Sequence, residues 1–200
     1  MKLQVGRNQK VWFTSDTHYG HSNICRATSN WPDEGKTRDF ESLDKMNAAI
    51  VNAINNNVGP DDILFHLGDW SFGGFESIRE FWDRIVCKNI HYVLGNHDHH
   101  IDRNRGNVRD LFKSVSWFDQ FEYQGETIET CHYPISSWNG LRKGRIHLHG
   151  HCHLPFDKKI SNGRRMDVGM DGNLEFAPYE LKEVIKALKR HQIGSEMGVD

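Results

Sequence analysis

The sequence has few cysteines, almost no net charge and no long apolar run. None of its 4 cysteines stands in a C-x-x-C pair, which excludes a cysteine-based zinc knuckle and a disulfide framework. We therefore expect reduced thiols and a cytoplasmic protein. The 25 basic and 27 acidic residues leave a net charge of −2, which argues against a general nucleic-acid coat. No apolar run approaches the ~20 residues of a membrane helix, and no signal peptide is expected from the polar start MKLQVGRNQK.

What the chain does have is a normal apolar fraction and many histidines. With 200 residues and 37% apolar side chains it can bury the core of one domain, which we expect to cover 1–190, followed by a disordered tail at 191–200. Of the 13 histidines, seven cluster at 97–100 and 147–153. A chain rich in histidine and poor in cysteine points to metal chemistry with imidazole and carboxylate ligands.

The hydrophobic pattern alternates between strands and helices and predicts an α/β fold. Apolar runs predict strands at 11–14, 62–67 and 90–94, with a long polar loop at 19–41 and helices around 43–54 and 78–86. Ser42 is the expected N-cap of the first helix. The second half predicts a hairpin at 121–133 turning at Gln124–Gly125, strands at 145–150 and within 164–172, and a terminal helix at 181–188.

Side chains of types that bind metals follow five of these strands. Asp16-Thr17-His18, Gly68-Asp69 and Gly95-Asn96-His97-Asp98 follow the first three strands, while His132 and Gly150-His151-Cys152-His153 follow two later ones. Functional groups of α/β folds lie in loops just past the carboxyl ends of strands. A single D-x-H pair or Gly-Asp turn arises easily by chance, but five such motifs after five strands indicate one site.

These side chains suit two divalent metal ions, which need a bridging carboxylate and a mixture of oxygen and nitrogen ligands. If Asp69 bridges, each metal has four protein ligands. One metal binds Asp16, His18, Asp69 and His153, and the other binds Asp69, Asn96, His132 and His151. Because thiolates are absent from the set, it favours Mn²⁺, Fe or Zn²⁺ over a closed structural zinc site, with Mn²⁺ favoured in vitro. Two metals ~3.5–4 Å apart can share a water, lower its pKa and clamp a phosphoryl oxygen.

The motif series D-x-H, G-D, G-N-H-D, H and G-H-x-H resembles that of the calcineurin-like metallophosphoesterase superfamily. The similarity is greater to a branch of small stand-alone members from bacteria and phages, whose opening S-D-T-H-F-G-H-x-N-I is similar to residues 15–24. It continues through PDDILFHLGDWSF (60–72), CHYPISSW (131–138), IHLHGHCH (146–153) and DVGMDGN (167–173), and so covers about 11–185. The resemblance implies a sandwich of two mixed β-sheets flanked by helices, with the metals at one edge.

The resemblance also implies an activity. It implies hydrolysis of a phosphoester by attack of a metal-bridging hydroxide, with His97 contacting the phosphate and protonating the leaving group. Asp98 is expected to orient His97, or alternatively to serve as a local turn or cap. His21 and Asn96 are further candidates for contact with the substrate. The chain departs from the family pattern G-D-x-x-D, because Phe72 stands where the second acid is expected.

Several alternatives stay open at this point. The substrate is a small or nucleotide-like phosphodiester or phosphomonoester. Seven basic residues and one acid between 139 and 165 either attract an anionic substrate or form a solvated rim. A nuclease of the same superfamily is an alternative, although the sequence contains no dedicated nucleic-acid-binding module. An inactive scaffold would be expected to have lost ligands, and a metal-storage protein would not need His97 and Asp98.

Overall fold

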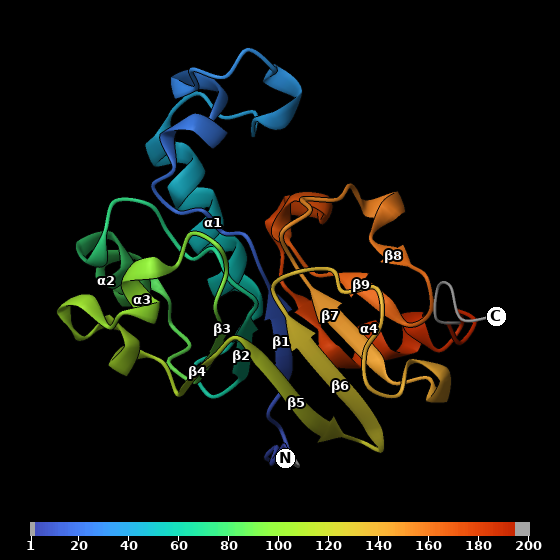
Figure 1. The fold of residues 1–200 in the computed structure, drawn as a ribbon. Helices are drawn as coiled ribbons and strands as arrows, with labels where there is room; N and C mark the ends of the chain where they lie inside the picture. The colour runs from blue at the N-terminus through green and yellow to red at the C-terminus, as the bar shows by residue number, and fades with distance from the viewer. Residues whose placement is uncertain (1–2, 195–200) are drawn as a thin grey trace.

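The computed structural model describes residues 3–194 and contains two five-stranded β-sheets (Figure 1). The strands are β1 (Val11–Thr14), β2 (Ile63–His66), β3 (Ile90–Val93), β4 (Ser114–Ser116), β5 (Phe118–Tyr123), β6 (Glu126–Cys131), β7 (Ile146–His149), β8 (Ile160–Ser161), β9 (Arg165–Asp167) and β10 (Tyr179–Glu180). The first sheet has the order β10-β1-β2-β3-β4, with only β10 antiparallel to its neighbour. The second has the order β5-β6-β7-β9-β8, in which β6, β7 and β9 are parallel. Both sheets are mixed, as predicted.

Three of the four helices lie where the sequence predicts them, and the short α3 was not predicted. The four are α1 (Leu43–Asn57), α2 (Phe75–Arg84), α3 (His99–Asp102) and α4 (Leu181–Leu188), and the first three lie on one side of the first sheet (Figure 1). The first helix begins after Ser42, because the hydroxyl of that residue accepts a hydrogen bond from the backbone N–H of Lys45 at 3.1 Å. Among residues 3–194, no helix is long and apolar enough to cross a membrane.

The first sheet is buried on both faces, which explains why its strands are continuously apolar. Trp12 and Leu64 belong to the apolar cluster under α1 and α2, whereas Phe13 and Phe65 belong to the cluster shared with the second sheet. The rings of Phe13 and Phe65 stack with their centroids 4.9 Å apart, and Phe121 of the second sheet stacks on Phe65 at 4.7 Å. These stacked rings pack the two sheets against each other, with the ends of their strands at a common edge.

The structure differs from the sequence prediction mainly in short elements. The strands β4, β8 and β10 contain only two or three residues each, too few for a periodic pattern, and were not predicted. The second helix ends at Arg84, so Val86 lies outside it and is 49% exposed. The predicted loop at 19–41 contains three short 3₁₀ turns and lies above the carboxyl ends of the first sheet (Figure 1).

The predicted tail is only partly within the described residues. Residues 195–200 lie outside them. Gly194 is buried, and its Cα lies so close to Gly163 that a side chain at either position would collide with the other backbone. The chain is therefore held against the loop before β9 up to this point.

Candidate metal centre

The polar residues predicted from the sequence come together at one edge of the sandwich. Asp16 and His18 follow β1, Asp69 follows β2, and Asn96 follows β3. His132 follows β6, and the pair His151 and His153 follows β7. Because β1 to β3 are parallel, and β6 and β7 are parallel, their carboxyl ends meet at this edge.

One half of the site contains Asp16, His18 and His153. The Nε2 atoms of the two histidines are 3.2 Å apart, and Nε2 of His153 lies 3.8 Å from a carboxylate oxygen of Asp16. Nε2 of His18 also lies 3.7 Å from Oδ2 of Asp69. One potential ligand atom from each of Asp16, His18 and His153 lies within 4.8 Å of the others, a spacing that a single ion can fill.

The other half is built from Asn96, His132 and His151. Oδ1 of Asn96 lies 3.0 Å from Nε2 of His132 and 2.9 Å from Nδ1 of His151. Nε2 of His132 lies 3.5 Å from the same Oδ2 atom of Asp69 that faces His18. Asp69 therefore stands between the two halves, and a further group of potential ligand atoms, from Asp16, Asp69 and His132, spans both of them.

The protonation of two histidines fits a metal centre. Nδ1 of His132 donates to the carbonyl of Leu67 at 2.7 Å, and Nδ1 of His153 donates to Asp171 at 2.6 Å. Nε2 of each ring then faces the candidate site, where it lies next to Asn96 Oδ1 in one case and the imidazole of His18 in the other. A cation between Nε2 of His132 and Oδ1 of Asn96 would bind both atoms. The donor set thus fits divalent cations.

Burial changes the acid–base properties of the site. Burial raises the pKa of the Asp16 carboxyl to about 6, although the nearby His153 and His132 oppose this shift. The pKa of His18 is lowered well below its ordinary value, first by burial and then by the charge of Arg38. Buried carboxylates need a positive partner, so a cation at this position would favour the ionised form of Asp16.

The backbone at the site is unusual. Five of the seven candidate ligands have a left-handed φ between 48° and 71°, namely Asp16, His18, Asp69, His151 and His153. A residue other than glycine pays of order 1–3 kcal/mol in this region and keeps it only when its surroundings enforce it. Gly68, with φ +99°, allows His132 to pack closely here, because a Cβ there would lie 2.5 Å from Nδ1 of His132. Such strain is concentrated at functional sites.

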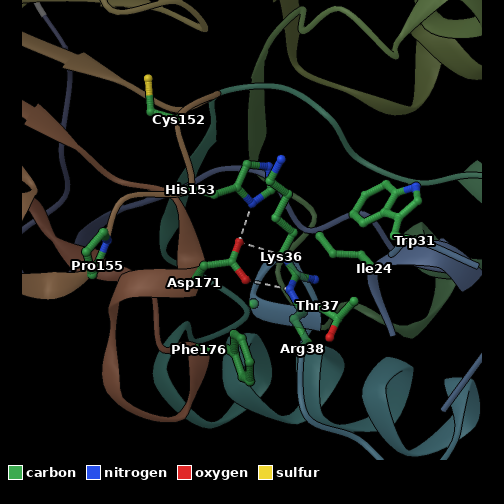
Figure 2. A pocket seen from close by; sticks show the side chains of 11 residues that line it. Ile24, Trp31, Lys36, Thr37, Arg38, Cys152, His153, Pro155, Asp171 and Phe176 are labelled. Atoms are coloured by element: carbon green, nitrogen blue, oxygen red, sulfur yellow. Dashed lines mark hydrogen bonds and ion pairs between the residues drawn. The ribbon is translucent and has the colours of Figure 1, made fainter. Parts of the chain in front are cut away.

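A buried arginine and an aspartate hold this edge together, and the sequence analysis missed both. Asp171 accepts from Nδ1 of His153 and from Nε of Arg38, each at 2.6 Å (Figure 2). The guanidinium of Arg38 also donates to the carbonyls of Asp16 and Thr17 at 2.6 and 2.8 Å. Burial raises the pKa of Asp171, but the charge of Arg38 and its hydrogen bonds outweigh burial and hold that pKa well below its usual range.

A second buried cation holds the loop that carries Asp171. Nζ of Lys159 lies 3.2 Å from Oδ1 of Asp167 and 2.5 Å from the carbonyl of Gly169. Both acids of the segment DVGMDGN, Asp167 and Asp171, are therefore neutralised by buried cations. The segment itself was the available signal, because it contains two acids next to glycines at the end of a strand.

The basic stretch of the second half does not form a free cationic patch. Lys159 is 1% exposed and paired as described. Arg145 faces the buried Glu129 at 3.6 Å, and Arg164 faces Glu126 at 3.6 Å. The guanidinium of Arg165 donates to the carbonyl of Ile135 and to the Ser161 hydroxyl, both at 2.8 Å. Many of these basic side chains are therefore paired with acids or hydrogen-bonded within the fold.

The residues expected to act on the substrate lie beside the metal centre. The backbone N–H of His97 donates to Oδ1 of Asp69 at 3.0 Å, while its exposed ring lies with its centroid 5.7 Å from that of His18. His21 stacks on Phe72 at 3.7 Å between ring centroids, and burial lowers the pKa of His21 to about 4. Phe72, which replaces the second acid of the family pattern, therefore contacts the rings of His21 and His97.

Asp98 has a different role from the one expected first. Its buried carboxylate accepts from the backbone N–H groups of Gly95, Asp69 and Trp70 at 2.6, 2.8 and 3.2 Å. A buried carboxylate requires several donors, and these backbone groups satisfy it, so it is directed at the loops after β2 and β3 rather than at the ring of His97. The alternative reading, a local turn or cap, describes the contacts of Asp98 better.

A cavity of about 700 Å³ opens beside the metal centre (Figure 2). It lies between the loop at 19–41 and the loops that follow β7 and β9, and His153 and Asp171 form part of its wall. A second hollow shares Pro155 and Asp171 with it. The half of the site that contains His153 is therefore the half that faces this space.

Comparison with known proteins agrees with the motifs. Residues 9–185 match the family model described as calcineurin-like phosphoesterase. An uncharacterised protein of Methanocaldococcus jannaschii is 25% identical over 92% of this chain and 94% of its own, and the Gene 66 protein of Mycobacterium phage D29 is 25% identical over 90% and 97%. A solved structure of a protein of unknown function from Aquifex aeolicus superimposes with a TM-score of 0.65 at 21% identity, covering 90% of this chain and 100% of that one.

Proposed function

Since the chain belongs to the calcineurin-like phosphoesterase family, we propose that it is a hydrolase of phosphoesters that depends on two divalent metal ions. The observation that supports this most directly is the position of Asp69. One oxygen of its carboxylate faces His18 in one half of the site and His132 in the other, at 3.7 and 3.5 Å. A carboxylate shared between two sets of ligands is what a dinuclear centre requires.

The two halves divide the ligands between the metals. Asp16, His18, Asp69 and His153 would hold one ion, and Asp69, Asn96, His132 and His151 would hold the other. Mn²⁺, Fe and Zn²⁺ all suit this set of oxygen and imidazole ligands, and we infer that Mn²⁺ supports activity in vitro. When bound, such ions supply a water of lowered pKa and offset the negative charge of the phosphoryl oxygens.

Side chains of the protein would position the phosphoester and donate a proton to it. The ring of His97 is exposed and lies next to the centre, so it can reach a phosphate oxygen or the leaving group and donate a proton there. Asn96 and His21 also lie beside the candidate metal centre and are candidates for contact with the substrate. Asp98 would act indirectly, because it holds the backbone of Asp69 and of the loop that begins at Gly95.

The experiment that tests this function measures hydrolysis of bis(p-nitrophenyl) phosphate and p-nitrophenyl phosphate with and without Mn²⁺. We expect EDTA to abolish turnover and Mn²⁺ to restore it. The variant Asp69→Asn should keep the circular-dichroism spectrum of the fold and lose turnover. Turnover that persists after verified metal removal would contradict the proposal, as would an Asp69→Asn variant of near wild-type activity.

The same assay addresses the alternatives. Preference for the diester would direct the search to nucleotide-like diesters, and preference for the monoester to nucleotides and phosphoproteins. If two metals bind per chain and neither compound is hydrolysed, the protein is either a very selective enzyme or an inactive scaffold. The four cysteines are free in the structure, and a cytoplasmic location is our inference from cysteine usage rather than from the fold.

A further inference from the structure

We propose that the cavity beside His153 binds the nucleoside of a phosphodiester substrate, with its base stacked on Trp31. This inference rests on the proposed function, because it describes the group attached to the phosphate that the metal centre would hydrolyse. The wall next to the centre is formed by His153 and Asp171, so a phosphoryl group at the centre has its ester substituent next to the cavity.

The size of the cavity favours a substrate with a group larger than a phosphate. Its volume of about 700 Å³ lies within the ~300–1,000 Å³ range of sites for small organic molecules and cofactors. An inorganic phosphate or a methyl ester would leave most of this space filled by water. A nucleoside is large enough to fill a substantial part of it.

The walls are suited to a planar ring. Trp31, Ile24, Pro155 and Phe176 supply apolar surface on different sides, as Figure 2 shows. Trp31 is 38% exposed, which leaves part of its ring available for contact. The ring is held by its edge-to-face contact with His21, at 5.8 Å and 86°. A base stacks well on an aromatic side chain held in this way, whichever base it is.

The charged side chains of the cavity are paired with one another or with neighbours, so its surface suits a neutral ring. The carboxylate of Asp171 is occupied by Arg38 and His153. Lys36 is exposed, and its ammonium lies 3.8 Å from its partner Asp33, too far for a strong hydrogen bond. The lining therefore presents mainly aromatic and apolar surface beside paired charges, which suits a stacked base.

The test compares two Mn²⁺-dependent substrates with the same leaving group and the same charge. Thymidine 5′-(p-nitrophenyl phosphate) has a nucleoside opposite the leaving group, whereas methyl p-nitrophenyl phosphate has only a methyl group there. The ratio of their kcat/KM values reports recognition of the nucleoside, since effects on folding or metal content cancel in it. A third ester, built on 2-deoxyribose without a base, separates the contribution of the base from that of the sugar.

We expect the wild type to prefer the thymidine ester to both other esters. The variant Trp31→Ala should lower the ratio of the thymidine to the methyl ester about tenfold, while Trp31→Phe, which keeps a flat ring, should retain most of it. A second readout needs no metal. Saturation-transfer NMR should detect contact between free thymidine and the metal-free wild type, and the base signals should disappear with Trp31→Ala.

Distinct outcomes would overturn this inference and the proposed function. If the methyl ester is hydrolysed as fast as the thymidine ester, or if Trp31→Ala slows both equally, the cavity does not recognise a nucleoside. In either case the phosphoesterase function stands. If the wild type hydrolyses none of the esters in Mn²⁺, the proposed function fails, and the inference that rests on it fails too.

Discussion

The carboxylate of Asp171 accepts a hydrogen bond from Nδ1 of His153 at 2.6 Å, and this bond decides which nitrogen of the imidazole faces the metal centre. With the proton held on Nδ1, the lone pair of Nε2 points at His18 and Asp16. Burial alone would lower the pKa of His153, but the hydrogen bond to Asp171 and the negative charges of Asp16 and Asp171 raise it above the ordinary value. A carboxylate behind an imidazole ligand commonly sets both its orientation and its basicity.

The variant Asp171→Asn should therefore weaken metal binding without changing the ligands themselves. An amide in place of the carboxylate loses the charge that supports His153 and typically costs about 10–100-fold in metal affinity. Calorimetric titration with Mn²⁺ would measure the loss, with the exposed Asp61→Asn as the matched control. Equal affinities for the two variants would show that Asp171 has no part in metal binding.

Arg38 should contribute to stability more than its position in a long polar loop suggests. Its guanidinium is 5% exposed and bonds two carbonyls of the β1 loop as well as Asp171. Removing one partner of a buried pair costs about 3–5 kcal/mol, so Arg38→Met should lower the free energy of unfolding by about 3 kcal/mol. Urea denaturation measures this, and Arg26→Met, which breaks only an exposed pair with Asp39, should cost less than about 1 kcal/mol.

His97→Ala should separate chemistry from metal binding. The bond from residue 97 to Asp69 uses the backbone N–H, so the substitution leaves it in place and the metal content should not change. Loss of a proton donor should slow hydrolysis about 100-fold or more for a phenyl ester, and less for the p-nitrophenyl ester, whose leaving group needs little protonation. The two rates, measured beside metal analysis, check this, and a loss that is equal for both esters would argue against proton donation by His97.

The stability of the fold should decrease in mild acid because of two buried histidines outside the metal centre. Burial lowers the pKa of both His66 and His147 to about 3. In the unfolded chain these imidazoles titrate near about pH 6.5. Between about pH 6.5 and 3 the unfolded state therefore binds more protons than the folded state, and the free energy of unfolding decreases as the pH is lowered. Each contributes a slope of about 1.4 kcal/mol per pH unit at most.

The variant His147→Gln should make this dependence shallower. Urea unfolding of the metal-free protein at pH 7.5, 6, 5 and 4.5 would measure the free energy of unfolding for both chains. We expect the free energy of unfolding of the wild type to be constant above pH 7 and to decrease below pH 6.5. The difference in this free energy between the wild type and the variant should become smaller as the pH is lowered. A pH dependence identical in the two chains would show that the His147 imidazole takes up its proton over the same pH range in the folded and the unfolded chain.

The sequence could predict that the candidate ligands lie close together because they follow strand ends. Asp16, Asp69 and His151 each follow an apolar run, and the carboxyl ends of parallel strands must meet, so their proximity follows from topology. Arg38 could not be found this way, because it lies in an irregular loop with no period, more than 130 positions from its partner Asp171. Asp98 was found, but its contacts with backbone N–H groups depend on loop conformation, which no local pattern specifies.

The left-handed backbone at five candidate ligands has a consequence for the evolution of the chain. Glycine or asparagine would occupy these positions with less conformational penalty than aspartate or histidine. The sequence that best stabilises this fold is therefore not the sequence that best binds metal. Selection for thermal stability alone would be expected to replace ligands first, and an inactive descendant could be the more robust protein.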